Sequence, residues 1–497
     1  MANEAKGAAT PKITEQVGEK SLLDQIVETG RVGTDTATRE RGKNLVKEFI
    51  TQVLEGSVTV SKDTEAMINA RIAQIDHLLS IQLNEILHHP TFQKLEGSWR
   101  GLRYLISQRE TSAMLKIRVM NVSKKDLLRD LQRAPEFDQS AAFKKIYEEE
   151  FGVFGGQPYG ALIGDYEFSK HPEDLELLEK MAAVAGAAHA PFISAASSQL
   201  LNMESFQQLD QPRDIGRIFD TTEFAKWKGF RQSDDSRYVG LCVPHILMRL
   251  PYGRDTVPVD AFNYEEGVDG TDHSKYLWGN AAYAMGARMT NAFSLYGWCA
   301  AIRGVQGGGL VEGLPSHTFR TDDGDVALKC PTEIAITDRR EKELADQGLI
   351  PLVHCKGTDK AAFFSVQSGN KPKLYDSDAA NANARLSSQL PYIMACCRFA
   401  HYLKAMMRDR IGSFTSKEEL QMFFNRWITQ YVTTDDSATQ ATKAKYPLRE
   451  ARVDVEEVKG KPGVYRAVAF LRPHFQLDEL TVSLRLVASL PAPAGKG

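Results

Sequence analysis

Five glycines between residues 304 and 313 are the strongest sign of ligand chemistry in the sequence, because a glycine loop can cradle a phosphate with its backbone N–H groups. They are Gly304, Gly307, Gly308, Gly309 and Gly313. Their spacing argues against a phosphate site. A P-loop requires a lysine and a hydroxyl residue after its last glycine, whereas Leu310 and Val311 follow Gly309. The GxGxxG pattern also fails, because Glu312 stands where its third glycine belongs.

The segment before these glycines decides how they are interpreted. Residues 276–303 are rich in alanine and aromatic residues, and only Arg288 and Arg303 are charged. This composition predicts a buried helix. Phosphate loops precede their helix, whereas these glycines follow it, at its electronegative end. We therefore interpret the segment as a core helix that glycines end in a tight, close-packed turn. The alternative is a cytoplasmic α/β enzyme with a ligand site at residues 304–313.

Other residues suited to catalysis or metal binding do not form a recognised pattern. His354 precedes Cys355, but adjacency in sequence does not create the geometry of a nucleophile and its base. His77 and His88 lack the HExxH pattern of a zinc helix. Acidic residues that could bind a cation are more typical of turns; they are Asp234, Asp235, Asp322, Asp323 and Asp325. We expect no enzyme, no metal site and no cofactor.

Composition places the chain among ordinary globular proteins. Its 497 residues are 42% hydrophobic and 25% charged, and 61 Lys and Arg against 64 Asp and Glu give a net charge of -3. This balance favours neither nucleic acid nor an anionic membrane as a partner. No apolar run approaches the roughly 20 residues of a membrane-spanning helix, and the N-terminus lacks the pattern of a signal peptide. Four of the six cysteines are scattered, Cys396 and Cys397 are neighbours, and no CxxC occurs, so we expect reduced thiols and a cytoplasmic protein without direct membrane insertion.

Apolar residues at helical spacing predict an N-terminal helical region over residues 42–54, 61–89 and 90–106. The second helix carries an apolar stripe formed by Ile68, Ile72, Ile75, Leu79, Leu83 and Ile86. The third has an apolar face with Trp99 as its aromatic anchor, together with Leu95, Leu102 and Ile106. A short helix before them carries Leu22, Leu23, Ile26 and Val27 on one side. It either packs on its own domain or serves as a tethered recognition helix.

From residue 114 onward, strand and helix patterns alternate. Strands are predicted over residues 114–119, 159–166, 191–197 and 238–250, with helices over 124–134 and 172–189. This order predicts a mixed α/β fold with a parallel sheet flanked by helices. Strand-like segments follow at 327–338 and 361–370, helices at 339–349, 380–410 and 417–432, and a linker at 433–447.

The chain end predicts a different structure, a β-hairpin plus a third strand over residues 449–458, 463–472 and 480–489. Val453 and Val455 alternate with charged residues, as in a strand with one buried face. Three strands are close to the lower limit of a stable sheet, and their edges invite pairing. Either a helix covers this sheet, or another chain adds strands to it.

Four long blocks carry a family resemblance. They are HPTFQKLEGSWRGLRYLI from His89, RDIGRIFD from Arg213, FRQSDDSRYVGLCVPHILMRLPYG from Phe230, and the block from Trp278 to Pro315. Together they resemble the large sheath subunit of the bacterial type VI secretion system, over roughly residues 20 to 490 and in the same order. The resemblance implies a phage-tail-sheath-like core and a structural, contractile protein.

The resemblance also implies partners. A small sheath subunit would form a heterodimer with this chain, and the heterodimers would polymerise with other sheath protomers around an inner tube protein, on a baseplate. Contraction would propel the tube and its spike. A Clp-family AAA+ ATPase would then recycle the sheath by gripping an N-terminal helix, which Leu22, Leu23, Ile26 and Val27 match by position.

Three regions follow from this resemblance. Residues 1–60 would be a flexible N-terminal arm with short helices, residues 61–440 the sheath core, and residues 441–497 the inter-subunit β-sheet segment. The strands of that last segment would interlace with those of neighbouring protomers. Its candidate strand residues are Val453, Val455, Val464, Val468, Phe470, Val482, Leu484 and Leu486.

Overall fold

The computed structural model describes residues 36–54, 64–108, 114–321, 324–413, 416–459, 464–474 and 476. Their contacts divide the chain into two units. One contains residues 1–81 with 261–264, and the other contains residues 82–260 and 265–497. Leu22, Leu23, Ile26 and Val27 of the predicted recognition helix lie outside the described residues, as do Val482, Leu484 and Leu486 of the predicted third strand.

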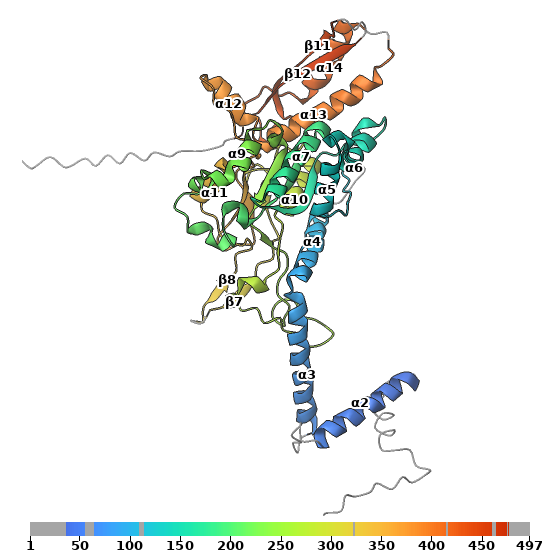
Figure 1. Cartoon of the computed structure of the whole chain (residues 1–497), viewed down its shortest axis with the longest axis vertical. Coiled ribbons are helices and arrows are strands. Elements are labelled where there is room, and N and C mark those ends of the chain that lie inside the picture. Colours follow the sequence, from blue (N-terminus) through green and yellow to red (C-terminus); the bar gives the residue numbers. More distant parts are fainter. Residues whose placement is uncertain are drawn as a thin grey trace, which may run out of the picture. The chain divides into compact units, whose positions relative to one another are not determined.

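Helices are the most abundant elements of the described chain (Figure 1). The α-helices are α2 (Thr36–Leu54), α3 (Thr64–Leu87), α4 (Pro90–Ser107), α5 (Lys124–Arg133), α6 (Ala141–Phe143), α7 (Pro172–Ala188), α8 (Gly216–Phe219), α9 (Ala225–Gln232), α10 (Ala282–Tyr296), α11 (Asp338–Asp346), α12 (Asp378–Leu386), α13 (Leu390–Asp409), α14 (Lys417–Ile428) and α15 (Gln440–Lys445). A π-helix, η2 (Lys144–Gly152), continues α6. Short 3₁₀ helices are η1 (Phe137–Gln139), η3 (Ser198–Leu201), η4 (Phe206–Asp210), η5 (Thr222–Phe224), η6 (Asp235–Tyr238), η7 (His273–Lys275) and η8 (Thr429–Tyr431).

A six-stranded mixed sheet with the order β1-β2-β3-β9-β10-β6 organises the larger unit. Its strands are β1 (Leu162–Phe168), β2 (Phe192–Ala196), β3 (Val239–Val243), β9 (Ile350–His354), β10 (Ala361–Phe363) and β6 (Leu310–Val311). The first four pair in parallel, and β10 runs antiparallel to both β9 and β6. The predicted mixed α/β fold is confirmed.

Both faces of this sheet are buried under helices. Successive strand residues point to opposite faces, so neighbours in one strand belong to different cores. Phe192 and Leu241 pack with α7 on one face, whereas Ile193 and Cys242 pack with α10 on the other. Strands covered on both sides have apolar sequences without alternation, which explains why β2 and β3 are buried along their whole length.

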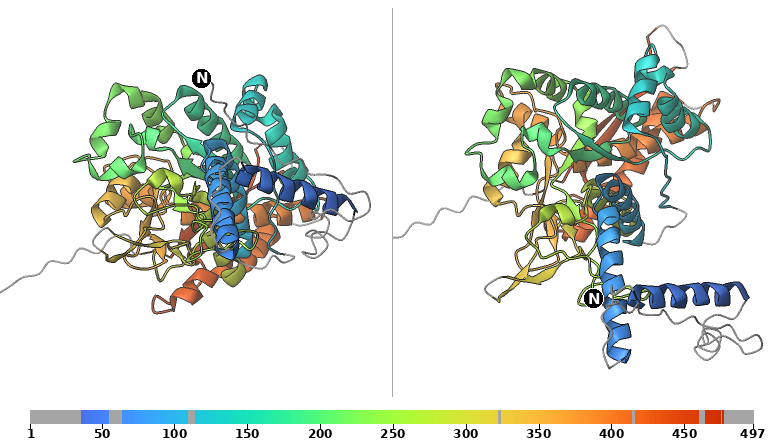
Figure 2. Two further views of the ribbon diagram at one scale, coloured as in Figure 1. Left: turned by 90° about the horizontal axis from the view of Figure 1, so that it is seen from below. Right: turned by 60° about the horizontal axis from the view of Figure 1, so that its bottom comes forward.

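The remaining strands form three separate two-stranded sheets. β4 (Ile246–Leu247) pairs with β5 (Trp278–Gly279), and β7 (Thr318–Arg320) pairs with β8 (Val326–Leu328). The β7–β8 hairpin stands apart from the six-stranded sheet (Figure 2, yellow). At the chain end, β11 (Leu448–Glu457) pairs with β12 (Tyr465–Pro473). No described helix is apolar over enough residues to cross a membrane.

Several predicted elements differ from those observed. Residues 115–123 are extended but form no strand, because they have no ladder partner among the described residues. β9 was not predicted. The strand expected at 327–338 is reduced to β8, the expected helix 380–410 is divided into α12 and α13, and the expected linker contains α15. α10 ends earlier than predicted, because Gly297 adopts a left-handed conformation with φ 78°.

Candidate inter-subunit interface

The C-terminal hairpin has its own hydrophobic core. Val453 and Val455 of β11 are buried against Phe424 and Ile428 of α14. Trp298 and Phe399 of α13 stack in the same core with ring centroids 4.3 Å apart. α14 begins with a capping box between Ser416 and Glu419, which fixes its first turn. Figure 1 shows α13, α14, β11 and β12 gathered at one end of this unit. A helix therefore covers one face of the hairpin.

α14 also occupies the outer edge of β11. The Asn425 side chain donates from Nδ2 to the carbonyl of Val453 at 2.7 Å, and its Oδ1 accepts from the Val453 N–H at 2.9 Å. One turn earlier, Gln421 Oε1 accepts from the Val455 N–H at 3.5 Å. A carboxamide has the donor and acceptor of a peptide unit. The two side chains therefore take the place of a neighbouring strand and close this edge.

The outer edge of β12 is open within the described part of the chain. In an antiparallel pair, residues alternate between those whose N–H and C=O face the partner strand and those whose groups face away. Val453 is of the second kind, because it bonds Asn425. Its cross-strand partner Ala469, and Ala467 opposite Val455, must therefore present their backbone groups to the outside of β12. Among the described residues, β12 pairs only with β11.

The structure separates the predicted strand residues into two groups. Val453 and Val455 are core residues of this chain, and their side chains are buried against α14. Val468 and Phe470 lie opposite Asp454 and Arg452 on the other face of the hairpin, where Phe470 is 52% exposed and lies under the Arg452 guanidinium. Val464 precedes β12 and is exposed; its carbonyl accepts from the Val458 N–H.

Asn425 and Gln421 were missed by the sequence analysis. Two amide residues four positions apart lie on one helix face, and this spacing was the available signal. It is a weak signal, because amides are also ordinary surface residues.

A second apolar surface lies on α3. Ile68, Ile72, Ile75 and Leu79, which follow the predicted stripe, are each between 45% and 51% exposed. Single exposed apolar residues are common, but a row of four large aliphatic side chains is typical of a surface that binds another protein. The predicted stripe is present, and nothing in the described part of its own unit buries it.

The apolar face predicted for α4 is not its buried face. Trp99 is 66% exposed, and Leu95 and Ile106 are exposed too, so Trp99 is not an aromatic anchor within this chain. The buried positions are Gly97, Gly101 and Leu105. A Cβ on Gly101 would lie 2.3 Å from the nearest ring atom of Tyr283 on α10. Glycine lets the two helices approach closely, and this approach, rather than side-chain hydrophobicity, selects the buried face.

A buried ionic network fastens α4 from its polar side. Arg249 donates from Nη1 to Glu266 at 2.6 Å and from Nε to Glu96 of α4 at 2.8 Å. Burial alone would lower the pKa of Arg249, but the hydrogen bonds and charges of Glu266 and Glu96 hold it above its ordinary value. A buried charge with two carboxylate partners is satisfied, which makes this network structural.

The glycine segment is a close-packed turn, as interpreted from the sequence. The Gly304 N–H donates to the carbonyl of Phe363 in β10 at 2.7 Å, and the Phe363 N–H donates back to Gly309 at 3.0 Å. A Cβ on Gly309 would lie 2.6 Å from the Phe363 carbonyl oxygen, so only glycine fits there. The Gly304 N–H is therefore used by β10, and the Gly309 N–H donates to the Gly304 carbonyl within the turn at 2.8 Å.

Among the acidic residues named as cation candidates, Asp234 is engaged in ion pairs. Asp234 pairs with Arg237 at 3.0 Å and with Lys373 at 3.6 Å. Asp322 and Asp323 lie outside the described residues. In the described ranges, no group of three His, Cys, Asp or Glu side chains is arranged to hold a metal ion.

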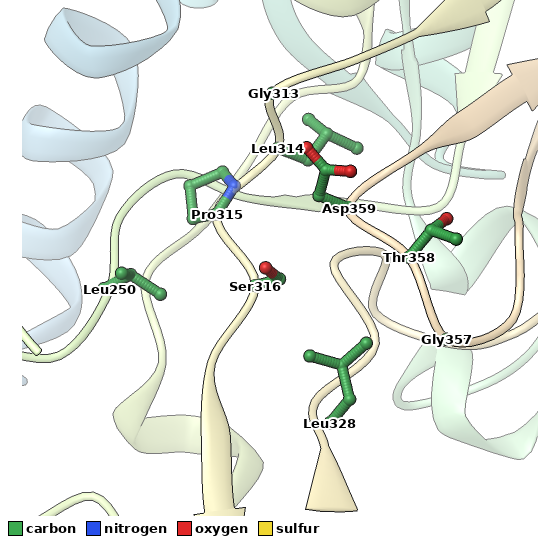
Figure 3. A pocket seen from close by; sticks show the side chains of 9 residues that line it. All are labelled: Leu250, Gly313, Leu314, Pro315, Ser316, Leu328, Gly357, Thr358 and Asp359. Atoms are coloured by element: carbon green, nitrogen blue, oxygen red, sulfur yellow. The ribbon is translucent and has the colours of Figure 1, made fainter.

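A cavity in the described structure has a volume of about 650 Å³ and is open to solvent. Figure 3 shows the side chains around it, which come from four stretches of the larger unit. They are Leu250, Gly313, Leu314, Pro315, Ser316, Leu328, Gly357, Thr358 and Asp359. Asp359 is the one charged side chain among them, so the lining does not resemble a site for an anionic cofactor.

Sequence comparison identifies the family. The EvpB/VC_A0108 tail sheath N-terminal domain matches residues 69–370, and the EvpB/VC_A0108 tail sheath gpW/gp25-like domain matches residues 379–490. The chain belongs to this tail-sheath family. The type VI secretion system sheath protein TssC1 of Pseudomonas aeruginosa is 52% identical over 493 residues, which cover 99% of this chain and 98% of that protein. The resemblance to the large sheath subunit of type VI secretion is confirmed.

Solved structures with similarity to this sheath protein come from other contractile systems. The anti-feeding prophage baseplate gives a TM-score of 0.35 at 8% identity, over 64% of this chain and 66% of that one. The sheath complex of an extracellular contractile injection system, PVC, in the contracted state gives a TM-score of 0.32 at 7% identity, over 62% of this chain and 68% of that one. The helical sheath of the anti-feeding prophage in the contracted state gives a TM-score of 0.31 at 10% identity, over 63% of this chain and 67% of that one.

Proposed function

We propose that this chain is the structural subunit of a cytoplasmic contractile secretion sheath. It forms a heterodimer with a small sheath subunit, and the heterodimers polymerise into a tubule around an inner tube, from a baseplate. Contraction of the tubule propels the tube and its spike. The observation that carries the polymerisation step is a hairpin with one closed edge and one edge that no described residue pairs with. Asn425 closes β11, and the outward N–H and C=O groups of β12 have no strand partner among the described residues.

An open strand edge suits a lattice that must change shape without dissociating. Main-chain hydrogen bonds between added strands give affinity that depends little on side chains, and such a linkage can bend while it stays paired. In this proposal the incoming strand of a neighbouring protomer pairs with β12 at Ala467 and Ala469. Val468 and Phe470 then face the side of the hairpin away from α14.

Ala469→Pro tests this step. Proline removes the outward N–H, and an edge strand tolerates proline where that N–H points away from its own sheet. We expect a folded heterodimer that does not form tubules, measured by sedimentation and negative-stain electron microscopy. Ala469→Val is the matched control, because it adds bulk at the same position and keeps the N–H. Tubules of normal length from Ala469→Pro would contradict strand addition at β12.

The recycling step rests on the N-terminal helix matched by position. In the proposal, a Clp-family AAA+ ATPase grips Leu22, Leu23, Ile26 and Val27 after contraction. Leu22→Asp combined with Ile26→Asp is expected to leave tubule assembly unchanged and to abolish ATPase-driven disassembly, followed by light scattering. Disassembly at the unaltered rate would place the recognition site elsewhere.

A further inference from the structure

Residues 116–121 form an extended segment whose main chain has no partner. The alternating sequence here predicts a strand, yet the segment belongs to no sheet. None of its backbone N–H or C=O groups hydrogen-bonds to another residue in the described part of the chain. A row of unpaired peptide groups on an extended segment is a template to which a strand of another chain can be added.

The segment is held in its extended conformation from both ends. Ile117 packs against the cluster that contains Leu105 of α4 and Tyr283 of α10. At the other end, the carbonyl of Val122 accepts from the Tyr166 hydroxyl of β1 at 2.8 Å. Because these contacts already order the segment, a partner strand that binds to it loses less free energy to ordering than it would on a mobile loop.

Two basic side chains fix the middle of the segment. Lys116 donates from Nζ to the Gln157 side-chain oxygen at 2.9 Å. Arg118 donates from Nη1 to the Glu150 carboxylate and to the Tyr159 hydroxyl, the latter at 3.4 Å. Each of these contacts is made by a side-chain atom, so the main chain between them stays available for pairing.

The apolar side chains of the segment are exposed where its main chain is unpaired. Val119 is 68% exposed and Met120 is 50% exposed. Successive side chains of an extended segment point to opposite sides, so this pair exposes apolar atoms on both sides. Valine is enriched in strands, where its branched side chain packs against residues of the neighbouring strand. A strand added beside the segment would provide that packing.

The charge of the segment indicates which kind of strand it binds. Residues 113–125 contain four basic residues and no acidic one. Two of the four have acidic partners, whereas Lys116 bonds a neutral amide and has only the electrostatic influence of Glu150 nearby. Pairing with the same segment of a second copy would bring basic residues opposite basic residues, which is destabilising. A strand with an acidic residue opposite Lys116 is favoured instead.

We propose that residues 116–121 bind an extended segment of the small sheath subunit, which pairs with them as a β-strand and places an acidic side chain beside Lys116. This inference rests on the heterodimer of the proposed function. Peptide groups face alternately to the two sides of a strand, so the added strand bonds every second residue. The strand that the sequence predicts here is then completed by a second chain.

Amide hydrogen exchange in the full-length heterodimer tests this pairing, with peptic peptides analysed by mass spectrometry. Unpaired, exposed amides exchange close to the rate of an unfolded peptide. We expect every second amide of residues 116–121 to exchange about a hundredfold more slowly in the heterodimer. Exchange of all of them at the unfolded rate in an intact heterodimer would overturn the inference and leave the proposed function standing. Protection that arises only in tubules would assign the segment to a second copy of this chain, which also overturns it.

Adjacent prolines test the alternation. Val119→Pro and Met120→Pro each remove one N–H, and the two N–H groups face opposite sides of the segment. We expect one variant to bind the small subunit about tenfold more weakly than the other, measured by affinity capture after co-expression, because one proline alone removes a hydrogen bond to the partner. Equal binding by both folded variants would contradict strand pairing.

A charge reversal tests the chemistry of the partner. Lys116→Glu breaks no ion pair of this chain, and we expect it to weaken capture of the small subunit about tenfold. Lys125→Glu is the matched control, because it makes the same change at an exposed residue of α5, outside the segment. An equal loss in both variants would show that net charge, and not an acidic residue beside Lys116, is responsible. A heterodimer that cannot be isolated even from the unaltered chain would overturn the proposed function, and this inference with it.

Discussion

At the scale of single residues, the ion pairs around His245 strongly raise its pKa. Its Nδ1 lies 2.5 Å from Glu333 and its Nε2 lies 3.0 Å from Glu167 of β1. Burial alone would lower the pKa of His245, but the two carboxylates raise it to about 10 from its ordinary 6.5. His245 lies between β3 and β4, so this charged group ties β1 and the segment after β3 to the segment that carries Glu333.

This shift predicts a pH dependence of stability. The folded pKa is raised, so the stabilisation is fully present below pH 6.5 and is lost as the pH rises towards about 10. His245→Gln is expected to lower the free energy of unfolding at pH 6 by about 3 kcal/mol, with a smaller loss at pH 10. Urea unfolding at both pH values measures this difference. His77→Gln, at an exposed histidine, is the control. An equal loss at both pH values would show that packing, and not charge, is responsible.

At the scale of elements, glycine decides how α4 and α10 pack. Gly101 lies against the ring of Tyr283, whereas Gly229 in α9 has nothing within 4 Å of its Cβ position. Glycine to alanine in an exposed helix interior stabilises by about 1 kcal/mol, and added volume in a close-packed contact destabilises by about 1–3 kcal/mol. The two substitutions should therefore have opposite signs. Gly101→Ala is expected to lower the melting temperature, and Gly229→Ala is expected to raise it. Calorimetry of both variants measures the two shifts. A rise in the melting temperature of both variants would show that Tyr283 moves aside at little cost.

Much of this element structure could be predicted from the sequence, because periodicity reports local burial. It succeeded for α3, α7 and β2 and for the C-terminal hairpin. It failed where a partner distant in the sequence decides the outcome. Residues 115–123 alternate like a strand but have no strand beside them. β9 is short and begins two residues after Gly348, with Pro351 inside it, so its place between β3 and β10 leaves little local signal.

The candidate sites also divide into those that local sequence patterns predict and those that depend on contacts between distant residues. The sequence pointed to the hairpin and to the α3 stripe, both of which depend on local pattern. It did not point to Asn425 as the residue that closes β11. Asn425 and Val453 are residues that only the tertiary fold brings together. The exposed face of α4 was missed because glycine, and not an apolar residue, marks its buried side.

At the scale of the whole molecule, the exposed row on α3 is expected to bind the small sheath subunit. Ile72→Asp combined with Ile75→Asp places two charges in that row, and burying a charge without a partner is costly. We expect at least a tenfold loss of co-purified small subunit, measured by affinity capture after co-expression. His77→Asp adds a charge on the opposite side of the same helix and should have no effect. Loss of capture in both variants would indicate that α3 is disrupted as a helix rather than as a binding face.

The central claim, that this chain builds a contractile sheath together with a small partner, is tested most directly by electron microscopy. The full chain is co-expressed with the small sheath subunit, and the purified material is imaged without added nucleotide. We predict hollow tubules with a cogwheel profile in cross-section, since the information for assembly lies in the subunit surfaces. Small soluble particles alone, at concentrations where the heterodimer is intact, would contradict the account.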